Sequence, residues 1–260
     1  MKKIYSLRNI KIKYLIYKRY DKKIFLVEGV KEFEMAIKGN FSPIEIFICK
    51  KIFNQYDIIK PFNHLVIFIS FKIFKKLAYR KNSGGIISLF KEKIFNKIKH
   101  IKIPKNPFIL ILDGIEKPGN LGSILRTADA VGVHLIILCN MKTYIFNKNV
   151  IRCSLGSVFT KKIFIEETNS IISWLKEKKI TILVLGFHKK SIQLYNTKIT
   201  SNLAIVLGSE KKGASNIWFK NADKIITIPM FGQIDSLNVS NALSIILYEG
   251  IRQRKYTTTY

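Results

Sequence analysis

The second half of the chain contains a series of short, almost continuously apolar runs that alternate with segments of helical pattern. Between residues 108 and 228 these runs are FILILD, LIILC, TILVL, LAIVL and KIITI. A strand that is apolar along its whole length must be covered on both faces, which is typical of the strands of a parallel sheet. The sequence therefore predicts an α/β domain in which helices cover both faces of a parallel sheet.

The N-terminal part shows a similar alternation on a smaller scale. FLVEGVKEFEMAIKG predicts a strand followed by an amphipathic helix that ends at Gly39. IEIFICK, HLVIFISF and GGIISLF are short β-branched or aromatic runs bounded by turns, and FKIFKKLAY has a helical pattern. We therefore expect a small α/β layer domain to precede the parallel-sheet domain.

The segment KEKIFNKIKHIKIPKNP, from Lys91 to Pro107, separates these two parts. It has lysine at nearly every second or third place and two prolines near its end, a pattern that favours an exposed linker. We place the boundary there, with a first domain over residues 1–103 and a second over residues 104–260.

The chain of 260 residues carries a formal net charge of +28, which favours a polyanionic partner, either nucleic acid or an acidic membrane surface. Residues 1–105 hold 25 basic and 7 acidic side chains, and the rest hold 20 and 10. Of the 45 basic residues 38 are lysine, which an A/T-rich coding sequence also produces, so composition leaves a functional and a mutational origin open. The apolar runs are far shorter than the roughly 20 residues of a membrane span. No long basic amphipathic segment with aromatic insertion residues supports a membrane-surface protein.

Three cysteines, Cys49, Cys139 and Cys153, lie far apart, and no CxxC or HExxH motif occurs. We therefore expect neither a disulfide framework nor a structural metal, and we expect a reducing, cytoplasmic location. The basic start MKKIYSLRNIKIKYL has charges that interrupt any signal-peptide core, but the absence of acids there leaves an organelle-targeting segment as an alternative.

In open parallel sheets ligands bind beyond the carboxyl ends of the strands, which directs attention to loops 113–122, 207–215 and 229–237. In the first loop we expect Asn120 to cap a helix that begins near Leu121, with Arg126 in its second turn. A capped helix with a solvated arginine is the simpler interpretation. The glycine spacing does not fit the GxGxxG pattern of dinucleotide-binding proteins.

The other two loops also combine glycine with polar residues. In LGSEKKGAS, Gly208 has no side chain to keep a ligand from the main chain, although Glu210 could simply form a surface ion pair with the lysines that follow it. In the third loop we expect Ser236 or Asp235 to cap the last helix and Asn238 to lie in its first turn. Capping explains Ser236, but it does not explain three such loops at one sheet edge.

Three segments of this half resemble the successive signature motifs of the SpoU–TrmH family, RNA ribose 2′-O-methyltransferases within the knotted SPOUT superfamily. These segments are PGNLGSILRTADAVGV, LGSEKKGAS and IPMFGQIDSLNVSNALSIILYEGIRQR, and their order and spacing agree with the family. Upstream, KRYDKKIFLVEGVKEFEMAIKGN and KNSGGIISLF resemble the family's N-terminal substrate-binding domain. The resemblance thus covers nearly the whole chain.

The resemblance implies that the protein transfers a methyl group from S-adenosylmethionine to a ribose 2′-hydroxyl of RNA. An N-terminal domain of this type favours large-subunit ribosomal RNA over transfer RNA as the substrate. The resemblance also implies a C-terminal trefoil knot, which chains otherwise avoid. The cofactor-binding residues that it implies are Leu207, Gly208, Ile228, Met230 and Leu237.

The functional polar residues that the resemblance implies are Asn120, Arg126, Glu210, Ser236 and Asn238. Methyl transfer needs the 2′-oxygen held about 3–3.5 Å from the methyl group, and a group that draws its proton away. Because arginine normally stays protonated, Arg126 could be a base in an unusual environment or a clamp for the adjacent phosphate. The asparagines and Ser236 are suited to orienting the ribose, and Glu210 to holding Arg126 or a loop amide.

Family members are usually homodimers whose sites are completed near the interface, so we expect a homodimer. The apolar helix segment ALSIILYEG could supply that contact, or it could be buried within the chain. The alternative function is that of a non-catalytic RNA-binding protein that keeps the fold and assists ribosome assembly. The intact polar set argues against this alternative.

Overall fold

The computed structural model describes residues 2–17, 23–80, 83–93, 95 and 97–256. The chain divides into two compact units, the first formed by Met1–Ile94 with Phe146–Thr160 and the second by Phe95–Ile145 with Lys161–Tyr260. The expected boundary between residues 103 and 104 stays a prediction, because units defined by packing and domains defined by function need not begin at the same residue.

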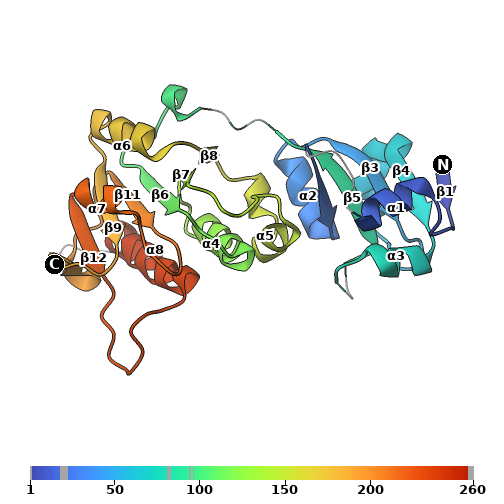
Figure 1. The fold of residues 1–260 in the computed structure, drawn as a ribbon. Coiled ribbons are helices and arrows are strands. Elements are labelled where there is room, and N and C mark those ends of the chain that lie inside the picture. The colour runs from blue at the N-terminus through green and yellow to red at the C-terminus, as the bar shows by residue number, and fades with distance from the viewer. Residues whose placement is uncertain (1, 18–22, 81–82, 94, 96, 257–260) are drawn as a thin grey trace. The chain divides into compact units, whose positions relative to one another are not determined.

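The first unit contains a mixed five-stranded sheet of order β1-β4-β3-β5-β2 (Figure 1). Strands β1, β3 and β4 are mutually parallel, and β5 is antiparallel to both of its neighbours. The strands are β1 (Lys2–Ile4), β2 (Ile24–Glu28), β3 (Pro43–Ile48), β4 (Val66–Ile69) and β5 (Ile86–Lys91). The helices are α1 (Ile10–Tyr17), α2 (Val30–Lys38), the 3₁₀ helix η1 (Tyr56–Leu65), α3 (Phe71–Leu77), α5 (Lys148–Cys153) and the 3₁₀ helix η3 (Ser157–Phe159). The predicted strands, the helix that ends at Gly39 and the helix of FKIFKKLAY are confirmed.

The residues that follow Phe146 complete the aromatic core of this unit. The ring of Phe25 in β2 stacks on Phe146 and Phe159, with ring centroids 4.4 and 5.7 Å apart. Phe41 meets the same two rings edge-on, at 5.6 and 5.2 Å. Such aromatic pairs add about 0.5–1.5 kcal/mol each to the effect of burial. This long-range pairing could not be predicted from the sequence, since no local pattern links residues that far apart.

The second unit is built on the predicted parallel sheet, and each of its strand pairs is parallel. Its order is β10-β12-β9-β11-β6-β7-β8. The strands are β6 (Phe108–Asp113), β7 (Leu135–Cys139), β8 (Ile163–Ile165), β9 (Thr181–Leu185), β10 (Ile192–Gln193), β11 (Leu203–Leu207) and β12 (Lys224–Thr227). The helices are η2 (Ile98–His100), α4 (Pro118–Ala130), α6 (Thr168–Glu177), η4 (Leu194–Asn196), α7 (Asn216–Lys220) and α8 (Val239–Lys255).

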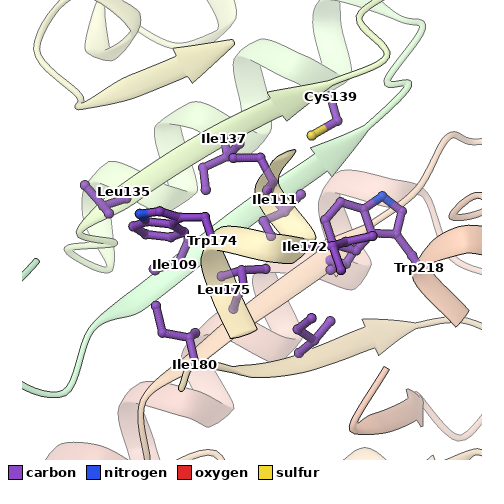
Figure 2. Close-up of a cluster of buried hydrophobic side chains, with 14 of the residues drawn as sticks. Ile109, Ile111, Leu135, Ile137, Cys139, Ile172, Trp174, Leu175, Ile180 and Trp218 are labelled. Carbon is purple, nitrogen blue, oxygen red and sulfur yellow. The ribbon is translucent and has the colours of Figure 1, made fainter. Parts of the chain in front are cut away.

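Helices cover this sheet on both faces, as the fully apolar strands require. Figure 2 shows Ile109 and Ile111 of β6 in one cluster with Trp174 of α6 and Trp218 of α7. Alternate residues of a strand point to opposite faces, so Leu110 and Leu112, which are also buried, belong to the other face. There α4 packs against α8.

The lysine-rich segment before Pro107 is mostly exposed, as expected of a linker, but its described isoleucines are not. Ile98 is buried in the same hydrophobic cluster as Trp174 and Trp218, and Ile101 and Ile103 pack against that cluster. The amide of Ile98 donates a hydrogen bond to the Glu166 carboxylate at 3.0 Å. The lysines of this segment thus face solvent, whereas the isoleucines between them supply apolar surface to the second unit.

Two predicted helix starts are wrong. Helix α4 begins at Pro118, because proline lacks the N–H that a first helical residue leaves unbonded and its φ already suits a helix. Asn120 therefore lies inside the first turn and does not cap it. Helix α8 begins at Val239, and Asn238 is its cap. The side-chain oxygen of Asn238 accepts a hydrogen bond from the amide of Ser240 at 2.9 Å, so neither Asp235 nor Ser236 caps this helix.

None of the helices in the described ranges combines the length and the apolar character that a membrane crossing requires. The same residues contain no group of three or more histidine, cysteine or acidic side chains that could hold a metal ion. The cysteines are free thiols, and burial raises the pKa of the Cys139 thiol to about 12.

We predict that Ile137→Ala destabilises the protein by about 2–5 kcal/mol, because it leaves a cavity in a core that cannot collapse freely. Ile137 is 0% exposed, whereas Ile165 in neighbouring β8 is 40% exposed. Ile165→Ala is the matched control and should cost much less in denaturant unfolding. Equal losses for the two variants would contradict the packing described.

Candidate active site

A cavity of about 690 Å³ lies at the carboxyl-terminal edge of the parallel sheet of the second unit. Its volume falls within the roughly 300–1,000 Å³ of small-molecule sites. Residues of all three predicted loops line it. The lining includes every expected cofactor-binding residue and four of the five expected polar residues, namely Leu207, Gly208, Ile228, Met230, Leu237, Asn120, Glu210, Ser236 and Asn238.

A fourth loop, which sequence reasoning missed, completes the lining with Leu185, Gly186 and Phe187. These residues end or follow β9, and β9 lies between β11 and β12 in the sheet. Its carboxyl end must therefore reach the same edge as theirs. A glycine after an apolar strand was visible in the sequence, but the strand order that places it at the cavity was not.

The glycine at position 208 is needed by the loop itself. A Cβ on Gly208 would overlap the backbone of Gly213 and Ala214, where the loop returns on itself. Ser209 and Gly213 close this turn with two backbone hydrogen bonds, each of 3.0 Å. The space beside Gly208 that we assigned to a ligand is thus filled by the chain, although Gly208 still lines the cavity through its main chain.

The carboxylate of Glu210 joins this loop to the one that follows β6. It accepts hydrogen bonds from the amides of Glu116 and Lys117 at 3.2 and 3.3 Å and from the side-chain amide of Asn120 at 2.7 Å. Within the described chain, no lysine or arginine lies within ion-pair distance of Glu210. Of the roles considered for Glu210, the structure thus shows the one in which it holds loop amides.

Asn120 extends this connection to the third loop. Its Oδ1 accepts from Nδ2 of Asn238 at 3.3 Å, while its own Nδ2 donates to Glu210. Donor and acceptor ends of the Asn120 amide are therefore both assigned, which fixes the orientation of its side chain. Ser236 is exposed, and its hydroxyl donates to the carboxylate of Asp235 at 3.1 Å.

These contacts also set the charge of Glu210. Burial by itself raises the pKa of this carboxyl, but the hydrogen bonds from Asn120 and from the backbone amides outweigh it, so the net pKa lies below the ordinary value. Glu210 is therefore a carboxylate that receives hydrogen bonds, which suits a structural acceptor better than a proton donor.

Arg126 is the one expected polar residue that does not line the cavity. It lies on the exposed side of α4, and no hydrogen-bond acceptor or carboxylate among the described residues contacts it. The structure thus brings Asn120, Glu210 and Asn238 together in one network and leaves Arg126 outside it.

We predict that Glu210→Gln lowers stability by about 1 kcal/mol at neutral pH, because the uncharged amide accepts the three hydrogen bonds less strongly. A carboxyl whose pKa is lowered by folding stabilises the folded state above its unfolded value, here near 4.5, and this contribution is lost as the pH falls through the folded value.

The difference in melting temperature between the wild type and Glu210→Gln should therefore be largest near pH 7 and shrink below pH 4.5. Glu177→Gln, an exposed carboxylate on α6, is the control. A difference that stays constant with pH would contradict the role given to Glu210.

Fold and site together define an α/β protein with a small-molecule cavity at the carboxyl edge of a parallel sheet. The chain matches the model of the SpoU rRNA Methylase family over residues 107–248, and that of the MRM3-like substrate binding domain over residues 2–88. The first match covers more than half of the chain, so the chain belongs to the SpoU rRNA Methylase family.

Several relatives carry the name 23S rRNA (guanosine-2′-O-)-methyltransferase RlmB. The one from Blochmanniella floridana is 40% identical over 151 residues, which are 58% of this chain and 59% of that protein. The one from Escherichia coli strain K12 is 37% identical over 149 residues, 57% of this chain and 61% of that protein. The match thus spans about three fifths of the length of these relatives.

Solved structures resemble nearly the whole chain. A crystal structure of an RNA 2′-O ribose methyltransferase has a TM-score of 0.82 and 29% identity, and the likeness covers 96% of this chain and 98% of that one. The AdoMet-bound rRNA methyltransferase from Sinorhizobium meliloti has a TM-score of 0.85 and 25% identity, covering 96% and 97%.

Proposed function

We propose that the protein transfers a methyl group from S-adenosylmethionine to a ribose 2′-hydroxyl of large-subunit ribosomal RNA. The observation that carries this proposal is the cavity of the second unit, which three loops with family signature residues line together. Relatives named 23S rRNA (guanosine-2′-O-)-methyltransferase support ribosomal RNA over transfer RNA as the substrate. We infer that the protein acts in the cytoplasm, where bacterial relatives of this kind meet ribosomal RNA.

The cavity fits S-adenosylmethionine in size and in chemistry. Leu207, Ile228, Met230 and Leu237 offer apolar contacts, and the main chain at Gly208 is open to the cavity. We infer that these residues hold the cofactor, which supplies an activated methyl group when it is bound. The trefoil knot that the resemblance implies stays a prediction.

The polar network beside the cavity has the geometry to orient a ribose. Because both ends of the Asn120 amide are engaged, this side chain cannot flip, and its neighbour Asn238 is held in turn by the start of α8. Glu210 acts through Asn120 and the loop amides, so we assign it a positioning role. Ser236 is exposed at the rim, and by exchanging its hydrogen bond to Asp235 it can turn its hydroxyl toward the ribose or its phosphate.

Arg126 is better placed to clamp a phosphate than to act as a base. It is exposed and has no described protein partner, so its guanidinium can bind an RNA phosphate with two parallel hydrogen bonds. A base would need an environment that removes the arginine proton, and an exposed helix surface does not supply one. Proton removal from the 2′-hydroxyl then falls to water or to the RNA itself.

We predict that Arg126→Lys lowers turnover by about tenfold or more, because lysine cannot form the bidentate contact. Affinity for S-adenosylmethionine should stay unchanged, since Arg126 does not line the cavity. Arg252→Lys, an exposed arginine of α8 that pairs with Glu249, is the matched control. Full turnover by Arg126→Lys would rule out the clamp.

The function itself is tested by incubating the protein with labelled S-adenosylmethionine and total RNA, followed by mapping of the methylated ribose. Label at a ribose 2′-oxygen of large-subunit ribosomal RNA is the expected result. Cofactor binding without label in any RNA would instead favour a non-catalytic RNA-binding protein that assists ribosome assembly.

We also propose that the protein is a homodimer. The apolar side of α8 already packs inside the protein, and its buried residues are Ala242, Leu243, Ile246 and Leu247. Exposed apolar surface lies instead on the loop before α8, where Phe231 is 94% and Ile234 is 63% exposed. This loop borders the cavity, so a second copy seated on it would lie close to the site.

We predict that light scattering finds a dimer of the wild type at micromolar concentration and a monomer of Phe231→Asp/Ile234→Asp, because a charge cannot be buried unpaired at an interface. Ile165→Asp, an exposed apolar residue of β8 at the opposite end of the sheet from β12, is the control. A fully active monomeric wild type would overturn the proposal.

A further inference from the structure

We propose that the first unit binds a single-stranded segment of RNA at the carboxyl-terminal edge of β1, β3 and β4, with a base stacked on Phe71. This inference rests on the proposed function in taking RNA as the ligand, but it concerns a surface separate from the cavity. We call it the Phe71 surface, and it comprises residues 5–9, 50–55 and 70–77, which follow the three strands.

The strand register brings these three segments together. Ile4 of β1 is paired with Ile69 of β4, and Ile48 of β3 is paired with Phe68. All three strands are parallel, so the chain leaves the sheet at the same level after each of them. Residues that are distant in the sequence therefore form one edge, in which Lys50 and Lys51 lie near the start of α3.

The charge of this surface is of one sign. Its residues include no aspartate or glutamate and six basic side chains, all exposed, which are Arg8, Lys50, Lys51, Lys72, Lys75 and Lys76. In the part of the chain that the structure describes, none of the six forms an ion pair. Elsewhere in the same unit lysines are paired, as Lys11 is with Glu45 and Lys60 is with Asp57. The coding bias that enriches lysine does not explain this separation of charges.

An exposed aromatic ring lies among these cations. Phe71 is 40% exposed at the first position of α3, whose preceding residue, Ser70, accepts a hydrogen bond from the amide of Ile73. The ammonium groups of Lys51 and Lys75 lie 5.1 and 5.8 Å from the centre of the Phe71 ring. A second exposed ring, Tyr5, follows β1 at the same edge.

Proteins bind single-stranded nucleic acid with aromatic rings flanked by cations, because a base stacks on the ring while lysines attract the adjacent phosphates. Lysine is a flexible point charge, so this surface would hold the backbone without reading the sequence. An anionic membrane could also meet aromatic and basic side chains. RNA is favoured because the match to the MRM3-like substrate binding domain spans these residues, in a chain that belongs to the SpoU rRNA Methylase family.

The test measures binding of a fluorescent oligouridylate strand to the full-length chain. Phe71→Leu keeps the apolar bulk but removes the stacking ring, and it should weaken binding by about tenfold or more. Phe71→Tyr keeps a ring and should restore binding. Binding of S-adenosylmethionine should be the same in both variants, since the cavity belongs to the second unit.

The charge contribution is measured by the salt dependence of the same binding. Each phosphate contact on a single strand contributes about 0.7 to the slope of log affinity against log salt, so Lys51→Ala/Lys75→Ala should reduce the slope by about 1.4. Lys31→Ala/Lys38→Ala removes the same charge from the exposed side of α2 and should leave most of the slope.

Equal affinity of Phe71→Leu and the wild type for the RNA strand would overturn the inference. If Phe71→Leu lost binding to phosphatidylserine vesicles but bound the RNA strand as tightly as the wild type, the inference would be overturned in favour of a membrane. If the wild type methylates no RNA and the Phe71→Leu defect in RNA binding persists, the proposed activity fails and the RNA-binding surface stands.

Discussion

A single carboxylate, that of Glu210, connects the loops that surround the cavity of the second unit. It accepts two hydrogen bonds from the loop after β6 and one from Asn120 in the first turn of α4. Asn120 in turn accepts a hydrogen bond from Asn238 at the start of α8. A carboxylate that is partly removed from water needs such donors, so the three loops and the charge stabilise one another. The orientations of Asn120 and Asn238, which we assign to the ribose, depend on this contact.

The parallel sheet makes this contact possible. β12, β9, β11 and β6 are successive neighbours, so their carboxyl ends open on one edge although the strands are far apart in the chain. The turn after β11 fits only because Gly208 has no side chain, which lets the backbone of Gly213 and Ala214 approach it. Sheet order and one glycine thus place Glu210 where the loop after β6 can reach it.

Local patterns in the sequence were sufficient for the longer apolar strands, their alternation with helices and the three loops, because burial on both faces dictates apolar runs. The short strands β1, β8 and β10 have too few residues to show such a pattern. They were insufficient where distant residues decide. The stacking of Phe25 on Phe146, the burial of Ile98 and the contribution of the loop after β9 all depend on tertiary packing. The residue type of Asn120 predicts a helix cap, whereas Pro118 begins the helix and leaves the Asn120 side chain to bond Glu210.

Equilibrium binding of S-adenosylmethionine to the wild type and to Gly208→Ala tests most directly whether these loops form a cofactor site. One cofactor molecule should bind each wild-type chain. Gly208→Ala should lose most of this affinity while circular dichroism shows a folded protein, because the added methyl group displaces the turn that carries Glu210. A folded wild type that does not bind the cofactor, or a Gly208→Ala variant that binds it equally well, would contradict the site described.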